Sequence, residues 1–306
     1  MKICAIGFDF MLPYIRSYCE LVEDARDADF VLTMNNAGAP QIVAGAREAA
    51  HDAGKPLCWW TIEDPNSLAG FMSQARMADF VFTSDKACIP HYRRQCGHDR
   101  VFWLPLAACE ELHRPLPLAD DAADFVFSGN WYDRQWEARR WGTETAILPL
   151  ARAGYSMAIF SYEEPPYPEL KGFWRGATSC YTVAEQYRHG KIVLGNNNQR
   201  TGMDGRGPTY MTSMRTTEAL ACGKAQIAPQ SDAYEALDIG AGLHMVSVDS
   251  PTQALQWAEH LLTNEDSRQS MGEEGRQLVL ACHTYRHRLE RISKALAGEA
   301  HPAEYE

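Results

Sequence analysis

The chain has 306 residues, of which 45% are apolar, 23% charged and 10% aromatic. This composition is typical of a soluble globular protein and excludes a fibrous or disordered one, while a formal charge of −11 argues against a partner held mainly through phosphate contacts. No apolar run reaches the roughly 20 residues of a membrane-spanning helix, and the segment 1–10 reads as a strand and not as a signal peptide. Nine cysteines without a C-x-x-C pair predict reduced thiols in a cytoplasmic protein.

Short apolar runs alternate with amphipathic segments in the first half of the chain. Five of these runs are predicted to be strands: Lys2 to Gly7, Asp29 to Thr33, Pro56 to Thr61, Phe80 to Ser84 and Val101 to Pro105. One amphipathic segment, such as Gln41 to Ala53, separates each strand from the next. This alternation is typical of βαβ units and predicts a parallel sheet.

A stretch of acids and prolines, Cys109 to Asp121, is predicted to link this half to a second one. Five further strands are predicted there: Asp124 to Ser128, Ser156 to Phe160, Ile192 to Leu194, Ala225 to Ala228 and His244 to Val248. We therefore expect an α/β protein with two Rossmann-like domains, residues 1–115 and 116–284, which face each other across a cleft. A C-terminal helix, Met271 to Leu296, is expected to cross back, so that residues 285–306 pack on the first domain.

Polar loops follow several of the predicted strands. In parallel sheets of this kind, ligands bind beyond the carboxyl ends of the strands and at helix N-termini. The loops of interest are Gly7 to Phe10, Glu63 to Asn66, Gly129 to Arg134 and the long, glycine-rich Gly195 to Tyr210, which precedes a helix expected from Arg215 to Cys222. We expect the chemistry of the protein in these loops.

The segment Ser213 to Gly223 resembles the donor-binding helix of GT-B glycosyltransferases, most closely that of the CgeB-like spore-maturation family. Four other parts of the chain resemble the same family in the same order: 79–85 with 101–107, 127–130 with 133–134, 189–196 and 283–288. The resemblance implies the GT-B fold and the transfer of a sugar from a nucleotide diphosphate sugar to an acceptor hydroxyl. In many retaining enzymes of this fold two glutamates stand eight positions apart, and here Tyr210 takes the place of the first.

The resemblance also implies a donor site in the second domain. Glu218 would accept the ribose hydroxyls, and Arg215 and Arg134 would bind the diphosphate. The same site would include three neighbouring residues, Gly129, Asn130 and Thr216. Each charged residue also has an alternative without a role in binding. Glu218 can be a solvated helix glutamate and Arg215 can form a surface ion pair. Arg134 can belong to a solvated helix face together with Arg139 and Arg140.

Candidate catalytic acids lie in the first domain. Glu63 and Asp64 end a predicted strand, where a carboxylate is well placed to take the proton of an acceptor hydroxyl. Asp64 followed by Pro65 is equally a good helix N-cap and first helical residue, which alone would explain the aspartate. Asp9, after the first strand, is the next candidate.

We expect no cofactor and no metal, because arginines and helix N-termini are available for the diphosphate and no D-x-D pair lies near the donor loop. If the likeness to retaining members holds, the donor's anomeric configuration is kept. The acceptor is open among a glycan, a protein and a small molecule. Two alternative functions remain, an enzyme that glycosylates a nucleic-acid base and a nucleotide-sugar-binding protein without turnover, and the first ranks lower because residues 1–115 carry more acids than bases.

Overall fold

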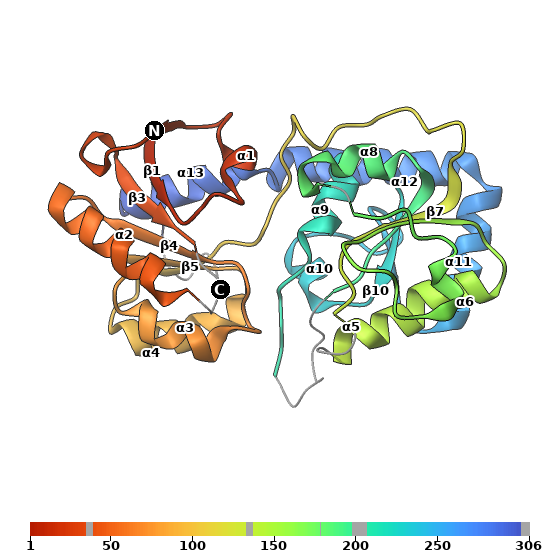
Figure 1. Cartoon of the computed structure of the whole chain (residues 1–306), viewed down its shortest axis with the longest axis horizontal. Coiled ribbons are helices and arrows are strands. Elements are labelled where there is room, and N and C mark those ends of the chain that lie inside the picture. The colour runs from red at the N-terminus through yellow and green to blue at the C-terminus, as the bar shows by residue number, and fades with distance from the viewer. Residues whose placement is uncertain (35–38, 133–136, 178, 198–206, 301–306) are drawn as a thin grey trace. The chain divides into compact units, whose positions relative to one another are not determined.

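The computed structural model of the chain describes residues 1–34, 39–132, 137–177, 179–197 and 207–300. Its contacts divide the chain into two compact units. The first consists of Met1–Leu106, Thr209–Met211 and the chain from Tyr285, and the second of Ala107–Pro208 and Thr212–Thr284. Each unit is built on its own parallel sheet (Figure 1). In the described ranges, no helix is long and apolar enough to cross a membrane.

The sheet of the first unit has the strand order β2-β1-β3-β4-β5-β6. Its strands are β1 (Lys2–Ile6), β2 (Glu20–Val22), β3 (Phe30–Thr33), β4 (Leu57–Thr61), β5 (Phe80–Thr83) and β6 (Val101–Trp103). Its helices are α1 (Leu12–Ile15), α2 (Pro40–Ala53), α3 (Leu68–Ala75), α4 (Ile89–Cys96) and α13 (Tyr285–Leu296), with short 3-10 turns η1 (Ala25–Asp27) and η2 (Lys86–Cys88). The five predicted strands are confirmed, and β2 is an additional edge strand of three residues that pairs with β1.

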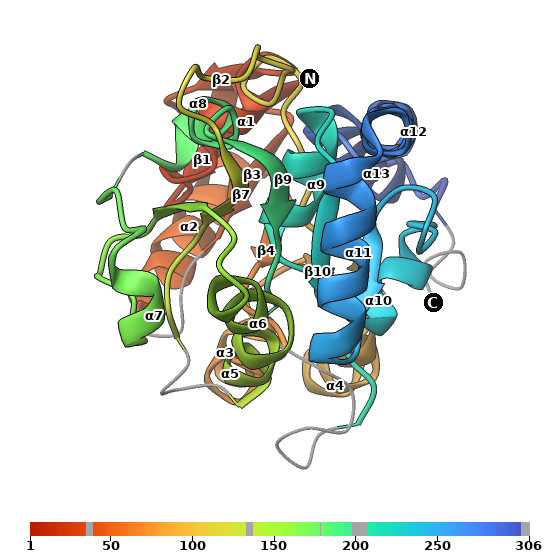
Figure 2. The same cartoon turned by 90° about the vertical axis from the view of Figure 1, so that its right-hand side faces the viewer.

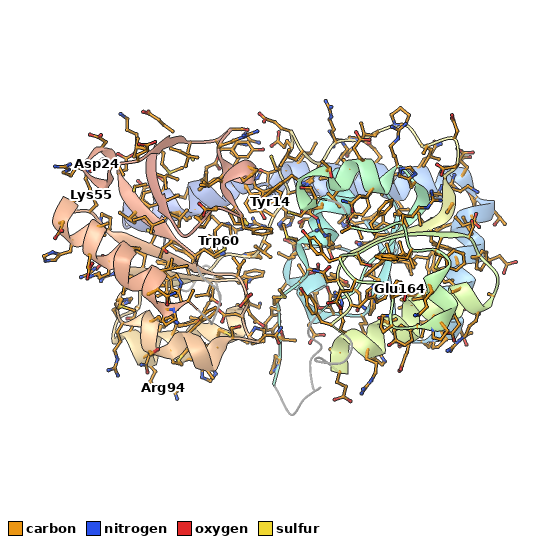
Figure 3. All side chains as sticks on the ribbon, viewed as in Figure 1. Tyr14, Asp24, Lys55, Trp60, Arg94 and Glu164 are labelled. Atoms are coloured by element: carbon orange, nitrogen blue, oxygen red, sulfur yellow. The ribbon has the colours of Figure 1, made fainter. Side chains whose placement is uncertain are left out.

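Two tryptophans of β4 show how helices cover both faces of this sheet. Successive strand residues point to opposite faces. The ring of Trp59 accordingly packs edge-on against Phe71 of α3, at 5.4 Å between centroids, whereas Trp60 lies 6.2 Å from Tyr285 of α13. Tyr14 of α1 stacks on the same Tyr285 at 5.4 Å. Helices α1 and α13 therefore share one face with Trp60 and Tyr14, which Figure 3 labels, and α3 covers the other.

The sheet of the second unit has the order β11-β10-β9-β7-β8. Its strands are β7 (Ala123–Ser128), β8 (Met157–Phe160), β9 (Gly190–Leu194), β10 (Gln226–Pro229) and β11 (Val246–Val248). Its helical elements are α5 (Glu137–Gly142), the π-helix η3 (Thr143–Ile147), α6 (Leu148–Arg152), α7 (Pro168–Lys171), η4 (Cys180–Thr182), α8 (Val183–Tyr187), α9 (Met214–Ala221), α10 (Asp232–Ala236), α11 (Pro251–Thr263) and α12 (Glu265–Cys282). All five strands predicted for this half are confirmed.

The two faces of the second sheet bury separate apolar clusters. Phe125 and Phe127 of β7 point into one cluster, which α6 and α11 complete. Val126, between them, points into the other, which contains residues of α8 and α9. Helices α6 and α11 lie side by side on their face of the sheet, as Figure 2 shows. The loops at the carboxyl ends of β7 and β8 are therefore carried by a sheet that is packed on both sides.

The C-terminal region differs from its prediction. A single helix from Met271 to Leu296 is wrong, because α12 ends at Cys282 and α13 begins at Tyr285. His283, between them, is buried and donates through Nε2 to the carbonyl of Leu237 at 2.8 Å, and Thr284 forms a β-bridge with Ala108. These contacts interrupt the helix inside the second unit.

The first unit holds α13 through an arginine. Arg288 is fully buried and donates from Nε to the carbonyl of Pro105 at 2.7 Å. The division of the chain falls after Leu106 and not after residue 115, because the segment that follows Leu106 already bonds to the end of the second unit: the amide of Ala108 donates to the carbonyl of His283 at 3.0 Å.

Candidate functional site

A pocket of about 160 Å³ lies in the second unit, at the carboxyl ends of β7 and β8 and the start of α9. Strands β7 and β8 end side by side, because Ser128 pairs with Phe160. The pocket is lined by Ser128, Gly129, Asn130, Tyr132, Arg139, Phe160, Ser161, Tyr162, Cys180, Gln186, Ser213, Met214 and Arg215. Strand order reverses at β7, which has β8 on one side and β9 on the other, and such a reversal is where open α/β sheets bind their ligands.

Arg139 supplies a buried positive charge to this pocket. Its Nη1 donates to the carbonyl of Asn196 at 2.9 Å and its Nη2 to the carbonyl of Asn130 at 2.6 Å. These carbonyls follow β9 and β7, so the guanidinium bridges the two strand ends at the reversal point. The residue is 5% exposed, and its guanidinium carbon lies 5.9 Å from the ring centre of Phe127. The alternative in which Arg139 forms part of a solvated helix face is wrong, because Arg139 is buried.

The loop after β7 is shaped around that guanidinium. A Cβ atom at Gly129 would lie 3.2 Å from Arg139 Nη2, so a side chain there would push the guanidinium away. The side chain of Asn130 donates to the hydroxyl of Tyr132 at 3.1 Å, and its Oδ1 accepts from the amide of Tyr162 at 3.4 Å. Tyr132 and Tyr162 are exposed and form an aromatic rim beside the buried charge.

The start of α9 contributes backbone amides and a second arginine. Ser213 caps the helix, since its hydroxyl accepts from the amide of Arg215 at 3.3 Å. Asn197 anchors the same turn, because its Oδ1 accepts from the amide of Ser213 at 3.2 Å. A helix N-terminus carries a partial positive charge, so the pocket combines two guanidinium groups with a dipole of the same sign.

Glu218 lies under Arg215 and does not line the pocket. Its side chain is fully buried, and Oε2 accepts from Arg215 Nη1 at 2.5 Å. Its Oε1 is 3.4 Å from Nε2 of His113, which is also fully buried. Direct contact of Glu218 with a ribose, which the family resemblance implies, is not the geometry found here, because both carboxylate oxygens face protein groups. Thr216 is likewise buried, and its hydroxyl lies 3.2 Å from that of Thr212.

Asp64 is sequestered inside the first unit. One of its oxygens accepts from Thr61 Oγ1 and, at 2.6 Å, from Thr83 Oγ1, and the other accepts from Tyr92 at 2.8 Å. Burial raises the pKa of its carboxyl group to about 7, against the lowering effect of the three hydroxyl donors. The alternative that Asp64 caps a helix is wrong, since α3 begins at Leu68 with Ser67 in the cap position.

Glu63 and Asp9 are more accessible than Asp64, the third candidate acid of the first unit. Glu63 is half-buried, and its Oε2 accepts from the hydroxyl of Ser67 at 3.0 Å. Asp9 follows β1 and is exposed. Both belong to the first unit, whereas the pocket residues belong to the second.

Three of the predicted donor residues, Gly129, Asn130 and Arg215, therefore come together in one pocket. Arg134 lies outside the described residues. Sequence reasoning missed Arg139 and His113. No spacing in the sequence marks Arg139, because its burial depends on the carbonyls of Asn196 and Asn130, which belong to two separate loops.

The second unit matches a known protein family. The sequence profile of a family described as glycosyl transferase-like matches residues 124–294, more than half of the chain and nearly all of the second unit. A comparison with curated protein sequences finds no significant match.

Several solved structures share the fold. HepE of Anabaena, in complex with UDP and glucose, superposes with a TM-score of 0.63 at 10% identity, covering 96% of this chain and 91% of HepE. Sucrose-phosphate synthase from Thermosynechococcus elongatus superposes with a TM-score of 0.58 at 14% identity, covering 89% of this chain and 75% of the synthase. A glycosyltransferase from Rickettsia africae superposes with a TM-score of 0.58 at 12% identity, covering 96% of this chain and 81% of that glycosyltransferase. The expected GT-B fold is thus confirmed.

Proposed function

Because the chain belongs to the glycosyl transferase-like family, we propose that it transfers a sugar from a nucleoside diphosphate sugar to an acceptor hydroxyl. The observation that carries the proposal is the buried guanidinium of Arg139, held at the reversal point of the second sheet beside Arg215. We further propose that it is a CgeB-like glycosyltransferase, which the resemblance of the segment Ser213 to Gly223 supports. We propose that it acts in the cytoplasm with its nine cysteines reduced.

The leaving diphosphate is the group that needs stabilisation in such a reaction, because negative charge develops on it as the glycosidic bond breaks. Arg139 and Arg215 supply two positive charges, and the capped start of α9 supplies amides of matching polarity. Arg134, next to the loop after β7, is proposed as a third contact. Glu218 acts through Arg215, whose Nη1 it holds, and not by touching the nucleotide.

The first unit is proposed to supply the base that takes the proton of the acceptor hydroxyl. Glu63 and Asp9 are proposed as alternative bases for the acceptor hydroxyl, because their carboxylates are not enclosed as that of Asp64 is. Retention of the donor's configuration and independence of metal ions are part of the proposal. The arginines of the pocket favour the latter, since they supply the positive charge that a metal ion would otherwise bring.

Calorimetric titration with nucleoside diphosphates tests the donor site. UDP is the first probe, because the related HepE fold has been seen with UDP, and GDP, ADP and TDP complete the set. We expect the wild type to bind at least one of them and Arg139→Met to bind it about 10-fold or more weakly, the usual loss for a hydrogen bond to a charged group. Arg140→Met is the matched control, since Arg140 is the exposed neighbour and should leave the affinity unchanged. Equal affinities of all three proteins would remove Arg139 from the site.

A further inference from the structure

His113 is a fully buried histidine that the proposed chemistry does not use. It closes a turn with Cys109, whose carbonyl accepts from the amide of His113 at 2.8 Å. In the same turn the amide of Cys109 donates to Nδ1 of the ring at 2.9 Å. Since Nδ1 accepts this bond, the neutral ring carries its proton on Nε2. Burial lowers the pKa of His113, although the neighbouring Glu218 has the opposite effect. The lowered pKa keeps the ring neutral.

The protonated nitrogen faces Glu218. Nε2 of His113 and Oε1 of Glu218 are 3.4 Å apart, and both side chains are fully buried. The other oxygen of the carboxylate accepts from Arg215 at 2.5 Å. A chain of contacts therefore runs from the backbone of Cys109 through the imidazole and the carboxylate to the guanidinium that lines the pocket.

We propose that His113 is a positioning residue, which fixes the carboxylate of Glu218 so that Arg215 presents its guanidinium to a nucleoside diphosphate. The inference rests on the proposed function. The terminal torsion of a glutamate is broad, so a carboxylate held at one oxygen alone is free to rotate and take Arg215 with it. A buried carboxylate oxygen that loses a facing N–H group also keeps its full desolvation cost. The N–H of His113, 3.4 Å from Oε1, opposes this rotation by electrostatic attraction from the side of the carboxylate away from the pocket.

A double-mutant cycle read by UDP titration tests the proposal on the full chain. We expect His113→Leu to weaken UDP binding about 10-fold or more, and His113→Gln, whose amide N–H reaches the place of Nε2, to stay within about 3-fold of the wild type. In a Glu218→Ala background, His113→Leu should add no further loss, because the group that it positions is gone. A general packing defect would instead cost the same in both backgrounds, and that result overturns the proposal.

Three further outcomes are distinguishable. If the wild type binds none of the nucleoside diphosphates, the proposed function fails and this inference with it. If the wild type binds UDP and His113→Leu binds it equally well, only this inference fails. Should His113→Leu not fold, the ring tautomer in the wild type decides: long-range nitrogen–proton spectra must show protonated Nε2 and bare Nδ1 at neutral pH, and the opposite tautomer overturns the proposal.

Discussion

At the scale of single residues, Asp64 shows how enclosure changes what a carboxyl group does. Three hydroxyl groups surround it, and two of them have a second acceptor within reach: Thr61 can donate to the carbonyl of Phe82 at 3.3 Å and Thr83 to that of Asp85 at 3.1 Å. A protonated Asp64 is therefore accommodated as well as an ionised one, because one threonine can turn to its carbonyl and accept the acid proton. This agrees with a pKa near 7 and gives Asp64 a structural role.

That raised pKa predicts a pH-dependent stability. The folded state binds the proton more tightly than the unfolded chain, whose aspartates titrate near 4, so this stabilisation is complete below about pH 4 and is lost as the pH rises to about 7. The span corresponds to roughly 4 kcal/mol of unfolding free energy. Asp64→Asn cannot titrate, so its unfolding free energy should lose this part of the pH dependence. Urea unfolding at a series of pH values between 4 and 8 measures the difference.

Asp9→Asn is the control for that experiment. Asp9 is exposed, and its replacement should leave the shape of the stability profile unchanged. Parallel profiles for the wild type and Asp64→Asn would show that Asp64 is ionised throughout and that the account of the hydroxyl network is wrong.

Residues are also where sequence reasoning reached its limit. The resemblance to GT-B glycosyltransferases implies that Gly129, Asn130 and Arg215 belong to one site, and all three line the pocket. Burial of a charged side chain is not visible in a sequence pattern. Arg139 looks like any helix arginine until the carbonyls of two separate loops converge on it, and His113 sits in a predicted linker whose fold depends on contacts with α9.

At the scale of elements, the π-helix η3 is tied to the pocket through Asn196. The side-chain Nδ2 of Asn196 donates to the carbonyl of Arg139 and to the hydroxyl of Thr143, both at 3.0 Å, while the backbone carbonyl of Asn196 accepts from Arg139. Gly142 lies directly against the side-chain oxygen of Asn196 and against Pro229, which leaves no room for a Cβ atom. π-helical turns are often found at functional sites, and here the turn brings Asn196 and Arg139 together.

Adding one methyl group at Gly142 should therefore disturb both the fold and the pocket. We expect Gly142→Ala to lower the unfolding free energy by about 1–3 kcal/mol, the usual cost of overpacking, and to weaken UDP binding because Asn196 must move. Gly45→Ala is the opposite case: Gly45 is an exposed glycine inside α2 with open space around it, so alanine should stabilise by about 0.5–1 kcal/mol. Thermal and urea unfolding of both variants checks the two signs. Stabilisation by Gly142→Ala would contradict the packing described.

Elements were more predictable than their ends. The ten predicted strands were found because a strand buried on both faces is a continuous apolar run. Strand β2 was missed because its three residues are exposed or half-exposed at the sheet edge. The break between α12 and α13 was missed because it depends on the contact of His283 with Leu237, 46 positions earlier in the chain.

At the scale of the whole molecule, both units repeat one topology. The first five strands of the first unit have the order β2-β1-β3-β4-β5, and the second unit has the same order, β8-β7-β9-β10-β11, when it is counted from its own first strand; β6 is an additional edge strand of the first unit. Strand order reverses at β1 in the first unit and at β7 in the second. Asp9 follows β1, and Gly129 and Asn130 follow β7. One fold thus places an acid in one unit and the anion pocket in the other.

This division predicts that substitutions of the acids in the first unit change the rate of sugar transfer but not the affinity for UDP. Glu63→Gln and Asp9→Asn should leave UDP affinity unchanged, and at least one of them should slow sugar transfer about 100-fold or more, the range for loss of a general base. Titration and turnover on the same preparations give both quantities. Near-normal turnover of both amides would place the base elsewhere.

Metal dependence is the second whole-molecule prediction. The diphosphate is expected to be neutralised by arginines and the start of α9, so turnover should survive an excess of EDTA. Loss of activity with EDTA and its return with magnesium or manganese would show that the charge balance of the pocket has been misassigned.

The most direct measurement is the release of nucleoside diphosphate from a panel of nucleotide sugars, with the wild type compared with Arg139→Met and Arg140→Met. Slow hydrolysis without an acceptor already reports competent chemistry, and a protein that only binds nucleotide sugars would give none. We predict that the wild type and Arg140→Met release nucleoside diphosphate from at least one donor. Release by Arg139→Met should be slower by about 100-fold or more, because a charge that stabilises the leaving group is removed. No release from any nucleotide sugar, or full activity of Arg139→Met, would contradict the account.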